Sequence, residues 1–250
     1  MPLFPPADAH DGSAAQIVPR NVEKLPLYHW RPGARLLAVG ARDGAAFAGD
    51  DAADATSYRR PLDEATLIAA QAKLRTDGVC AAWSESLRHP LGLAMLRRCR
   101  KGALVIATAG SIGAALVDEL LAEADAWVLL VASEPGPLAK TIVARARHVE
   151  VQLAVDHGVA PTLDWERIAA AHLCLRRAAA DPAVRAERYA AARATLPADL
   201  AIYDDFDSHS RCRGCEATLV WRAGGTARRD RLADDGRCAD CGRHSGIMTA

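Results

Sequence analysis

The chain lacks several features that mark common classes of protein. It has no net charge, with 31 basic and 31 acidic residues, so it offers no global attraction to nucleic-acid phosphates. Aromatic residues make up only 5% of it. No run of about 18 apolar residues is present, so we expect no membrane-spanning helix. The first residues lack the basic start and apolar core of a signal peptide. Half of the residues are hydrophobic, which favours a folded cytoplasmic protein.

Cysteine is absent from residues 1–79, and seven cysteines follow. An odd number in a chain without a signal peptide argues against a disulfide framework. Four of the cysteines form two CxxC pairs, Cys212 with Cys215 and Cys238 with Cys241, which 22 residues separate. Two CxxC turns that face each other complete a closed tetrahedral site, so this spacing predicts a structural zinc ion. A redox CxxC and an iron–sulfur cluster are the alternatives.

Two histidines flank the cysteine pairs, and the residues between the pairs have the pattern of a zinc ribbon. His209 and His244 are expected to lie beside the ion or in solvent, because four thiolates already saturate it. Residues 219–221 are expected to form a strand, and Gly224 and Gly225 a turn. We therefore assign residues 208–250 to a four-cysteine zinc-ribbon module.

Short apolar runs alternate with helical stretches from Arg35 onward. Strands are expected at residues 36–39, 79–83, 103–107, 126–131, 149–155 and 200–203, and helices at about 63–78, 89–100, 112–123, 138–145, 163–179 and 182–196. Continuous apolar strands between helices indicate a parallel sheet, either barrel-like or doubly wound, with functional loops at the strands' carboxyl ends. Residues 21–207 form this α/β domain, and residues 1–20, which show no period, are expected to be a flexible arm.

Two stretches of the chain resemble one family. The segment 21–40, NVEKLPLYHWRPGARLLAVG, resembles the EKKPLYHFLPG stretch of radical SAM proteins of the AmmeMemoRadiSam system. The tail from Asp235 to Gly242 is similar to the family's DGxCxxCG ending. The resemblance runs, with gaps, from about residue 17 to the end. It implies a radical SAM-like partial (β/α) barrel, TIM-barrel-like in its elements, with a small C-terminal zinc ribbon.

The sequence departs from that family where the family's chemistry lies. Family members carry CxxxCxxC after the first strand, and those cysteines hold a [4Fe–4S] cluster; here the positions are Gly44, Ala48 and Asp51. Glycine and alanine cannot ligate iron, so we expect no iron–sulfur cluster. The family's Asn-Glu-Pro after the second strand is Ser84-Glu85-Ser86 here. Glu85 is therefore the one weak candidate for contacting a cofactor.

Further polar positions of the family are lost as well. Its Thr-Asn-Gly after the third strand is Thr108-Ala109-Gly110 here, and the polar end of its fourth strand is Val128 to Val131. These replacements remove groups that would orient S-adenosylmethionine, so we expect no appreciable binding of it.

These features support three hypotheses. The first is a degenerate radical SAM-like protein, a pseudoenzyme that binds a partner or a small ligand. The resemblance suggests an intact family member or a Memo-like protein as that partner. The second is an enzyme with non-radical chemistry at the barrel mouth, using Glu85 and an acidic loop, Asp43, Asp50, Asp51 and Asp54. The third is a zinc ribbon that binds nucleic acid through Arg211, Arg213, Arg222, Arg228, Arg229 and Arg231. Neighbouring aspartates dilute that basic patch, so we expect no nucleic acid there.

Overall fold

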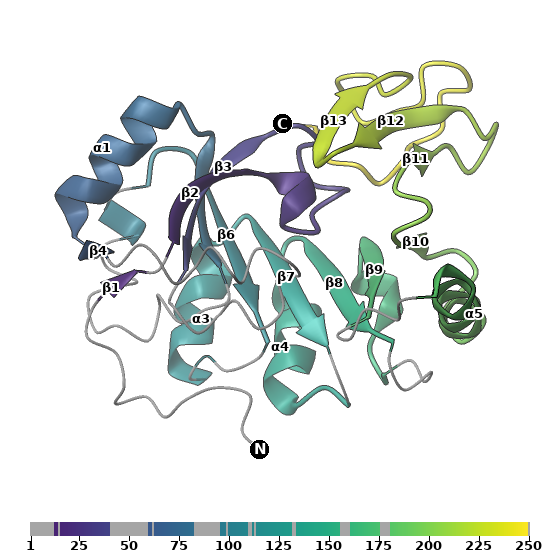
Figure 1. Cartoon of the computed structure of the whole chain (residues 1–250), viewed down its shortest axis with the longest axis horizontal. Coiled ribbons are helices and arrows are strands. Elements are labelled where there is room, and N and C mark those ends of the chain that lie inside the picture. Colours follow the sequence, from purple (N-terminus) through teal and green to yellow (C-terminus); the bar gives the residue numbers. More distant parts are fainter. Residues whose placement is uncertain are drawn as a thin grey trace. The chain divides into compact units, whose positions relative to one another are not determined.

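The structure, a computed structural model, describes residues 13–14, 16–40, 60–61, 63–82, 96–98, 100–109, 112, 114–131, 134–155, 161–175 and 181–249 (Figure 1). The chain divides into two compact units. The first contains Met1–Arg20 and Arg35–Trp127, and the second contains Asn21–Ala34 and Val128–Ala250. No helix within the described ranges is long and apolar enough to cross a membrane.

One sheet contains eight strands. They are β2 (Gln16–Asn21), β3 (Arg35–Gly40), β5 (Gly78–Ala82), β6 (Ala103–Thr108), β7 (Ala126–Val131), β8 (Val149–Ala154), β9 (Ala170–Cys174) and β10 (Ala201–Tyr203). Their order is β10-β9-β8-β7-β6-β5-β3-β2. The pairs β3–β5, β5–β6, β8–β9 and β9–β10 are parallel. The predicted α/β class with a mostly parallel sheet is thus confirmed. Among the described strands, the order from β3 to β10 follows the chain without a reversal.

Helices alternate with these strands. They are α1 (Glu64–Leu74), α3 (Ala114–Glu123), α4 (Pro137–Arg145) and α5 (Pro182–Arg193), with two 3-10 turns, η2 (Val22–Lys24) and η7 (Trp165–Arg167). A short antiparallel pair, β1 (Ser13–Ala14) with β4 (Arg60–Pro61), lies in the first unit. At the start of α1, the carboxylate of Asp63 accepts a hydrogen bond from the amide of Thr66 at 2.8 Å, as expected of an N-cap residue.

Three sequence expectations are corrected by the fold. Gly78 does not end the first helix: α1 ends at Leu74, and Gly78 opens β5, where a Cβ would collide with the backbone of Ala103. The expected helix at 163–179 is wrong, because a 3-10 turn and strand β9 occupy its described part. Alanine-rich composition suggested a helix, but burial between neighbouring strands overrides that propensity. Residues 16–20 of the expected arm belong to β2.

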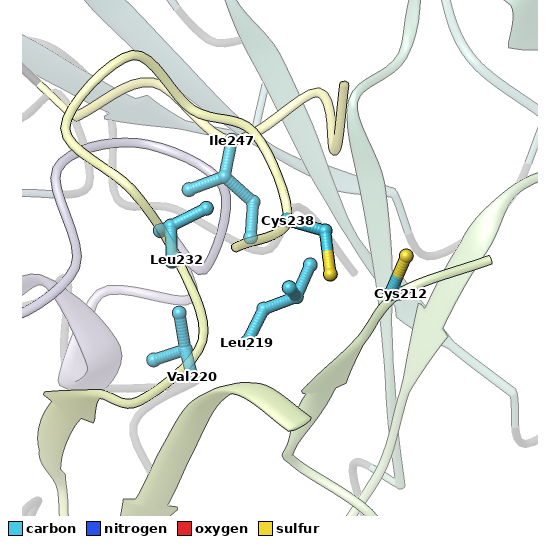
Figure 2. Packing of buried hydrophobic residues seen from close by; sticks show 6 residues of the cluster. All are labelled: Cys212, Leu219, Val220, Leu232, Cys238 and Ile247. Atoms are coloured by element: carbon cyan, nitrogen blue, oxygen red, sulfur yellow. The ribbon is translucent and has the colours of Figure 1, made fainter. Parts of the chain in front are cut away.

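The C-terminal part of the second unit is a small antiparallel sheet. Its strands are β11 (Ser210–Arg211), β12 (Thr218–Ala223) and β13 (Thr226–Arg229). Gly224 and Gly225, with φ of 58° and 73°, form the expected turn, because the left-handed region suits glycine. We call residues 208–249 the cysteine module, and Figure 2 shows its core. It consists of Cys212, Leu219, Val220, Leu232, Cys238 and Ile247.

Candidate metal centre and buried polar network

Four thiols converge within the cysteine module. The ligand atoms of Cys212, Cys215, Cys238 and Cys241 all lie within 4.8 Å of one another. The Sγ atoms of Cys212 and Cys241 are 3.4 Å apart, and those of Cys215 and Cys238 are 3.7 Å apart. Sulfurs about 2.3 Å from a tetrahedral zinc ion are about 3.8 Å from each other, whereas a disulfide brings them to about 2.05 Å. The four side chains therefore fit a single metal ion and not a pair of disulfides.

The two CxxC turns have matching backbone geometry. The amide of Glu216 donates to the carbonyl of Cys212 at 2.8 Å, and the amide of Gly242 donates to the carbonyl of Cys238 at 2.8 Å. Glu216 and Gly242 both have a positive φ, 60° and 73°. Each residue after the second cysteine thus turns the chain in the same way, which points both pairs of thiols at one centre.

Backbone amides also favour the ionised form of a ligand. The amide of Gly214 donates to Sγ of Cys212 at 3.3 Å. This contact and that of the Cys215 amide lower the pKa of the Cys212 thiol to about 6. Burial and the neighbouring thiols raise the pKa values of Cys215 and Cys241, so among these three thiols Cys212 ionises first. Thiolate is the form that binds metal ions.

The flanking histidines and one arginine are engaged elsewhere. Nδ1 of His209 accepts a hydrogen bond from the amide of Arg222 at 3.1 Å, and Nδ1 of His244 accepts one from the amide of Gly246 at 3.1 Å. Arg222 is buried, with 4% of its surface exposed. It therefore cannot belong to the exposed basic patch that the sequence suggested for nucleic acid.

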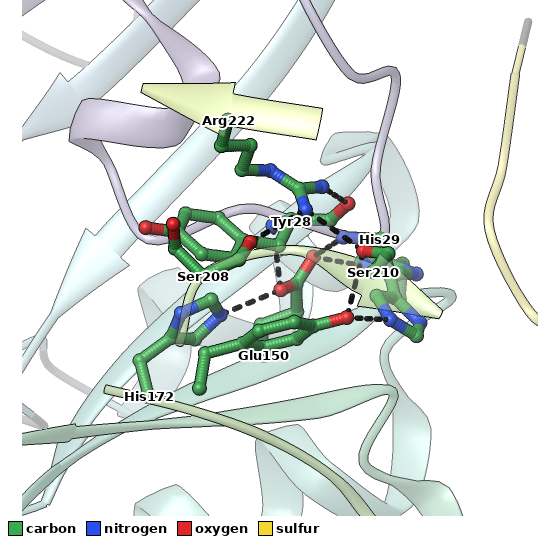
Figure 3. A network of polar contacts seen from close by, with 9 residues as sticks. Tyr28, His29, Glu150, His172, Ser208, Ser210 and Arg222 are labelled. Carbon is green, nitrogen blue, oxygen red and sulfur yellow. Dashed lines mark hydrogen bonds and ion pairs between the residues drawn. The ribbon is translucent and has the colours of Figure 1, made fainter. Parts of the chain in front are cut away.

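A second cluster of polar groups surrounds Glu150, the second residue of β8 (Figure 3). Its side chain has no exposed surface. One carboxylate oxygen accepts hydrogen bonds from the amide of His29 at 2.9 Å and from Nε2 of His148 at 3.0 Å. The other accepts from the amide of Tyr28 at 2.7 Å and from Nε2 of His172 at 2.8 Å. Four donors thus meet one buried carboxylate.

Arg222 supplies a positive charge to the same region. Its Nη2 donates to the carbonyl of Tyr28 at 2.6 Å, and its Nη1 donates to Oγ of Ser210 at 2.8 Å and to the carbonyl of Ser208 at 3.0 Å. Its guanidinium carbon lies 4.2 Å from the centre of the Tyr28 ring, within cation–π range. A strand of the cysteine module thus holds the segment around Tyr28.

His29 and Tyr203 complete the network. The Tyr203 hydroxyl lies 2.7 Å from Nε2 of His29 and 2.8 Å from Oγ of Ser210. The backbone continues the attachment, since the amide of Met248 donates to the carbonyl of His29 at 2.7 Å and the amide of Arg31 donates to the carbonyl of Met248 at 2.8 Å. His29 is therefore a packed, hydrogen-bonded residue with 5% of its surface exposed.

The network shifts several pKa values in opposite directions. Burial alone would raise the pKa of Glu150, but the hydrogen bonds and charges of His148 and His172 outweigh it and hold that pKa well below its usual value. Burial lowers the pKa of His29 to about 3 and raises the pKa of Tyr203 to about 12. At neutral pH the cluster therefore contains a carboxylate, a neutral His29 and a neutral phenol.

Several residues singled out from the sequence lie outside the described part of the chain: Gly44, Ala48 and Asp51, the acidic loop, and Glu85 with its neighbours Ser84 and Ser86. The structure does describe Thr108, which is buried at the end of β6, and Leu130, which is buried in β7. It brings the four predicted metal ligands together. It also shows Glu150, His148, His172 and Arg222 as a cluster that the sequence reasoning missed. The signal available in the sequence was a charged residue, Glu150, between two valines of an otherwise apolar strand.

Comparison with known proteins adds nothing to this geometry. No family model, no curated protein and no solved structure matches the chain.

The network predicts how stability depends on pH. Unfolding returns His29 from a pKa of about 3 to the ordinary value of 6.5, so the unfolded chain binds the extra proton as the pH falls. Between pH 6 and 4.5 this one group lowers the free energy of unfolding by up to about 1.4 kcal/mol per pH unit. Glu150 adds a further loss that begins as the pH falls toward 4.5, the ordinary pKa at which the unfolded chain takes up this proton, and that continues down to its depressed pKa in the folded protein. Urea denaturation of the wild type and of His29→Gln at several pH values measures this slope. An equal slope in both proteins would contradict the assignment.

Proposed function

We propose that the chain is a non-catalytic binding protein: a degenerate radical SAM-like protein that has given up the [4Fe–4S] cluster and keeps a structural zinc site. The observation that carries this proposal is the saturation of the Glu150 cluster. In the described part of the chain, the Glu150 cluster brings carboxylate, imidazole, phenol and guanidinium groups together in a buried position. The atoms that make these hydrogen bonds hold the Tyr28–His29 segment and are not free to act as acids or bases on a substrate. The remaining ring nitrogen of His29 is a weak base, because burial lowers the pKa of this histidine to about 3.

The strand order supports a partial barrel as the scaffold. Strands β3 to β10 follow chain order without reversal, and the pairs β3–β5, β5–β6, β8–β9 and β9–β10 are parallel. Sequential parallel strands with intervening helices are the pattern of a (β/α) barrel, and a partial barrel leaves its first and last strands unpaired with each other.

The carboxyl ends of the strands support the loss of chemistry. In (β/α) barrels, catalytic side chains come from these ends. The last residues of β3, β5, β6, β7, β8 and β9 are Gly40, Ala82, Thr108, Val131, Ala154 and Cys174. No carboxylate, imidazole or amine is among them.

Zinc is the ion that best suits the cysteine cluster. Four thiolates in two tight turns saturate a tetrahedral ion and leave no open position for a substrate. The core of the cysteine module is only six buried residues, too few to hold three short strands without a further link. When bound, zinc supplies that link. The partners of the proposed protein remain those that the resemblance suggests, an intact family member or a Memo-like protein.

The zinc proposal predicts the effect of removing one thiol. Purified protein should contain about one zinc per chain, and Cys215→Ser should lower that content severalfold because three ligands no longer close the site. Hydrogen exchange should then speed up in residues 210–249, and also in residues 28–31, which Arg222 and Met248 hold. Elemental analysis and exchange mass spectrometry measure both effects.

The matched control is Cys174→Ser, in which a hydroxyl can still donate to the carbonyl of Leu153, as the thiol does at 3.3 Å. This variant should keep its full zinc content. Full zinc content in Cys215→Ser would contradict the assignment of the four cysteines as the zinc ligands.

The absence of radical chemistry predicts two negative results for the zinc-loaded chain. Anaerobic treatment with iron and sulfide should produce no iron–sulfur absorption, because the family's three cysteine positions are Gly44, Ala48 and Asp51. Calorimetric titration with S-adenosylmethionine should show no binding at micromolar concentrations. A cluster on the zinc-loaded protein would refute the proposal. Micromolar binding that Glu85→Ala abolishes would instead favour an enzyme with non-radical chemistry.

A further inference from the structure

A pocket of about 600 Å³ lies beside the CxxC turns, at the amino ends of β9 and β10. Its lining comes from the segment before β9, from the segment before β10, and from the cysteine module near both CxxC turns. The volume falls within the range of about 300–1,000 Å³ that is usual for small-molecule sites. The loops at the carboxyl ends of the strands lie at the opposite end of β9 and β10. The pocket is therefore separate from those loops.

Three arginines line this pocket: Arg211, Arg213 and Arg243. Nη1 of Arg243 donates to the carbonyl of Arg213 at 3.1 Å, which ties the second CxxC turn to the first. Among the described residues, no carboxylate forms an ion pair with any of the three. Other arginines of the cysteine module differ, since Arg229 pairs with Asp234 at 3.3 Å and Arg231 with Asp240 at 3.5 Å. The pocket arginines therefore keep their planar donor groups for an anion.

A buried polar side chain also reaches the pocket. His29 is 5% exposed and lines it, and Nε2 of its ring lies against the Tyr203 hydroxyl. That contact leaves Nδ1 as the ring nitrogen for a ligand. Because the pKa of His29 is lowered to about 3, the ring is neutral and adds a hydrogen-bonding group without a charge.

The other wall of the pocket has a different character. Glu166 and Asp199 are exposed carboxylates, and Trp165 beside them offers a half-buried aromatic face. Carboxylates accept hydrogen bonds from hydroxyl groups, and an aromatic face packs against a sugar or another flat ring. The same carboxylates repel a continuous phosphate backbone, which argues against nucleic acid as the occupant.

We propose that this pocket binds a small organic phosphate that carries hydroxyl groups. The arginines hold the phosphate, Glu166 and Asp199 accept hydrogen bonds from the hydroxyls, and Trp165 packs against the body of the ligand. This inference goes beyond the proposed function, because it concerns a different site and needs neither the barrel nor the loss of the cluster.

Isothermal titration of the zinc-loaded full chain tests the proposal with three probes: ribose 5-phosphate, glucose 6-phosphate and glycerol 3-phosphate. At least one should bind, and its dephosphorylated form should bind at least 100-fold more weakly. Arg211→Gln and Arg213→Gln should each weaken the binding at least tenfold. Arg228→Gln is the matched control, since this exposed arginine of β13 does not line the pocket, and it should leave the affinity unchanged.

A second experiment tests the two carboxylates that line the pocket, Glu166 and Asp199. Glu166→Gln combined with Asp199→Asn should weaken binding of the organic phosphate and leave binding of inorganic phosphate equal or stronger. Zinc content is measured for every variant, so that damage to the metal site is recognised. No binding of any probe at 1 mM overturns the proposal, and so does an equal loss in Arg228→Gln. Displacement of the bound probe by a single-stranded RNA oligonucleotide at micromolar concentration would overturn it in favour of nucleic acid.

Discussion

A carboxylate without exposed surface is stable in a folded protein only when donors surround it, and Glu150 meets that condition with four. Two donors are backbone amides of Tyr28 and His29, and two are imidazoles from the region of β8 and from β9. The carboxylate therefore fixes both the path of an early segment and the orientation of two side chains. Arg222 then extends the arrangement to the cysteine module, where it holds the carbonyl of Tyr28.

This arrangement joins two segments that lie far apart in the sequence. They are the Pro-Leu-Tyr-His-Trp stretch and the CxxC tail. In the structure they meet through Arg222, Met248 and Asn21, whose side-chain amide donates to the carbonyl of Gly225 at 3.0 Å. These contacts hold the two segments together in the folded chain. The same interactions place His29 in the wall of the arginine-lined pocket.

Local sequence patterns predicted those parts of the structure that are determined by residues close together in the sequence. Six of the sheet strands followed from continuous apolar runs, and the cluster of four cysteines followed from CxxC spacing, because a tight turn needs only four residues. The strand β9 was missed because Ala-Ala-His-Leu-Cys has helix-like composition, and only burial beside β8 and β10 makes it a strand. The polar network was out of reach for another reason. Its contacts join residues 122 apart for Tyr28 and Glu150, 174 apart for His29 and Tyr203, and 194 apart for Tyr28 and Arg222. The pocket depends on the same long-range contacts.

The most direct measurement of the central claim is amide hydrogen exchange at Tyr28 and His29, in the wild type and in Glu150→Gln at neutral pH. Glutamine nearly keeps the shape of the side chain but turns an accepting oxygen toward a donating amide group, so it cannot satisfy all four donors. We expect strong protection of both amides in the wild type. In the variant we expect at least tenfold faster exchange at these amides and at the Met248 amide, which donates to the carbonyl of His29. Unchanged protection of Tyr28 and His29 in a folded Glu150→Gln protein would contradict the account.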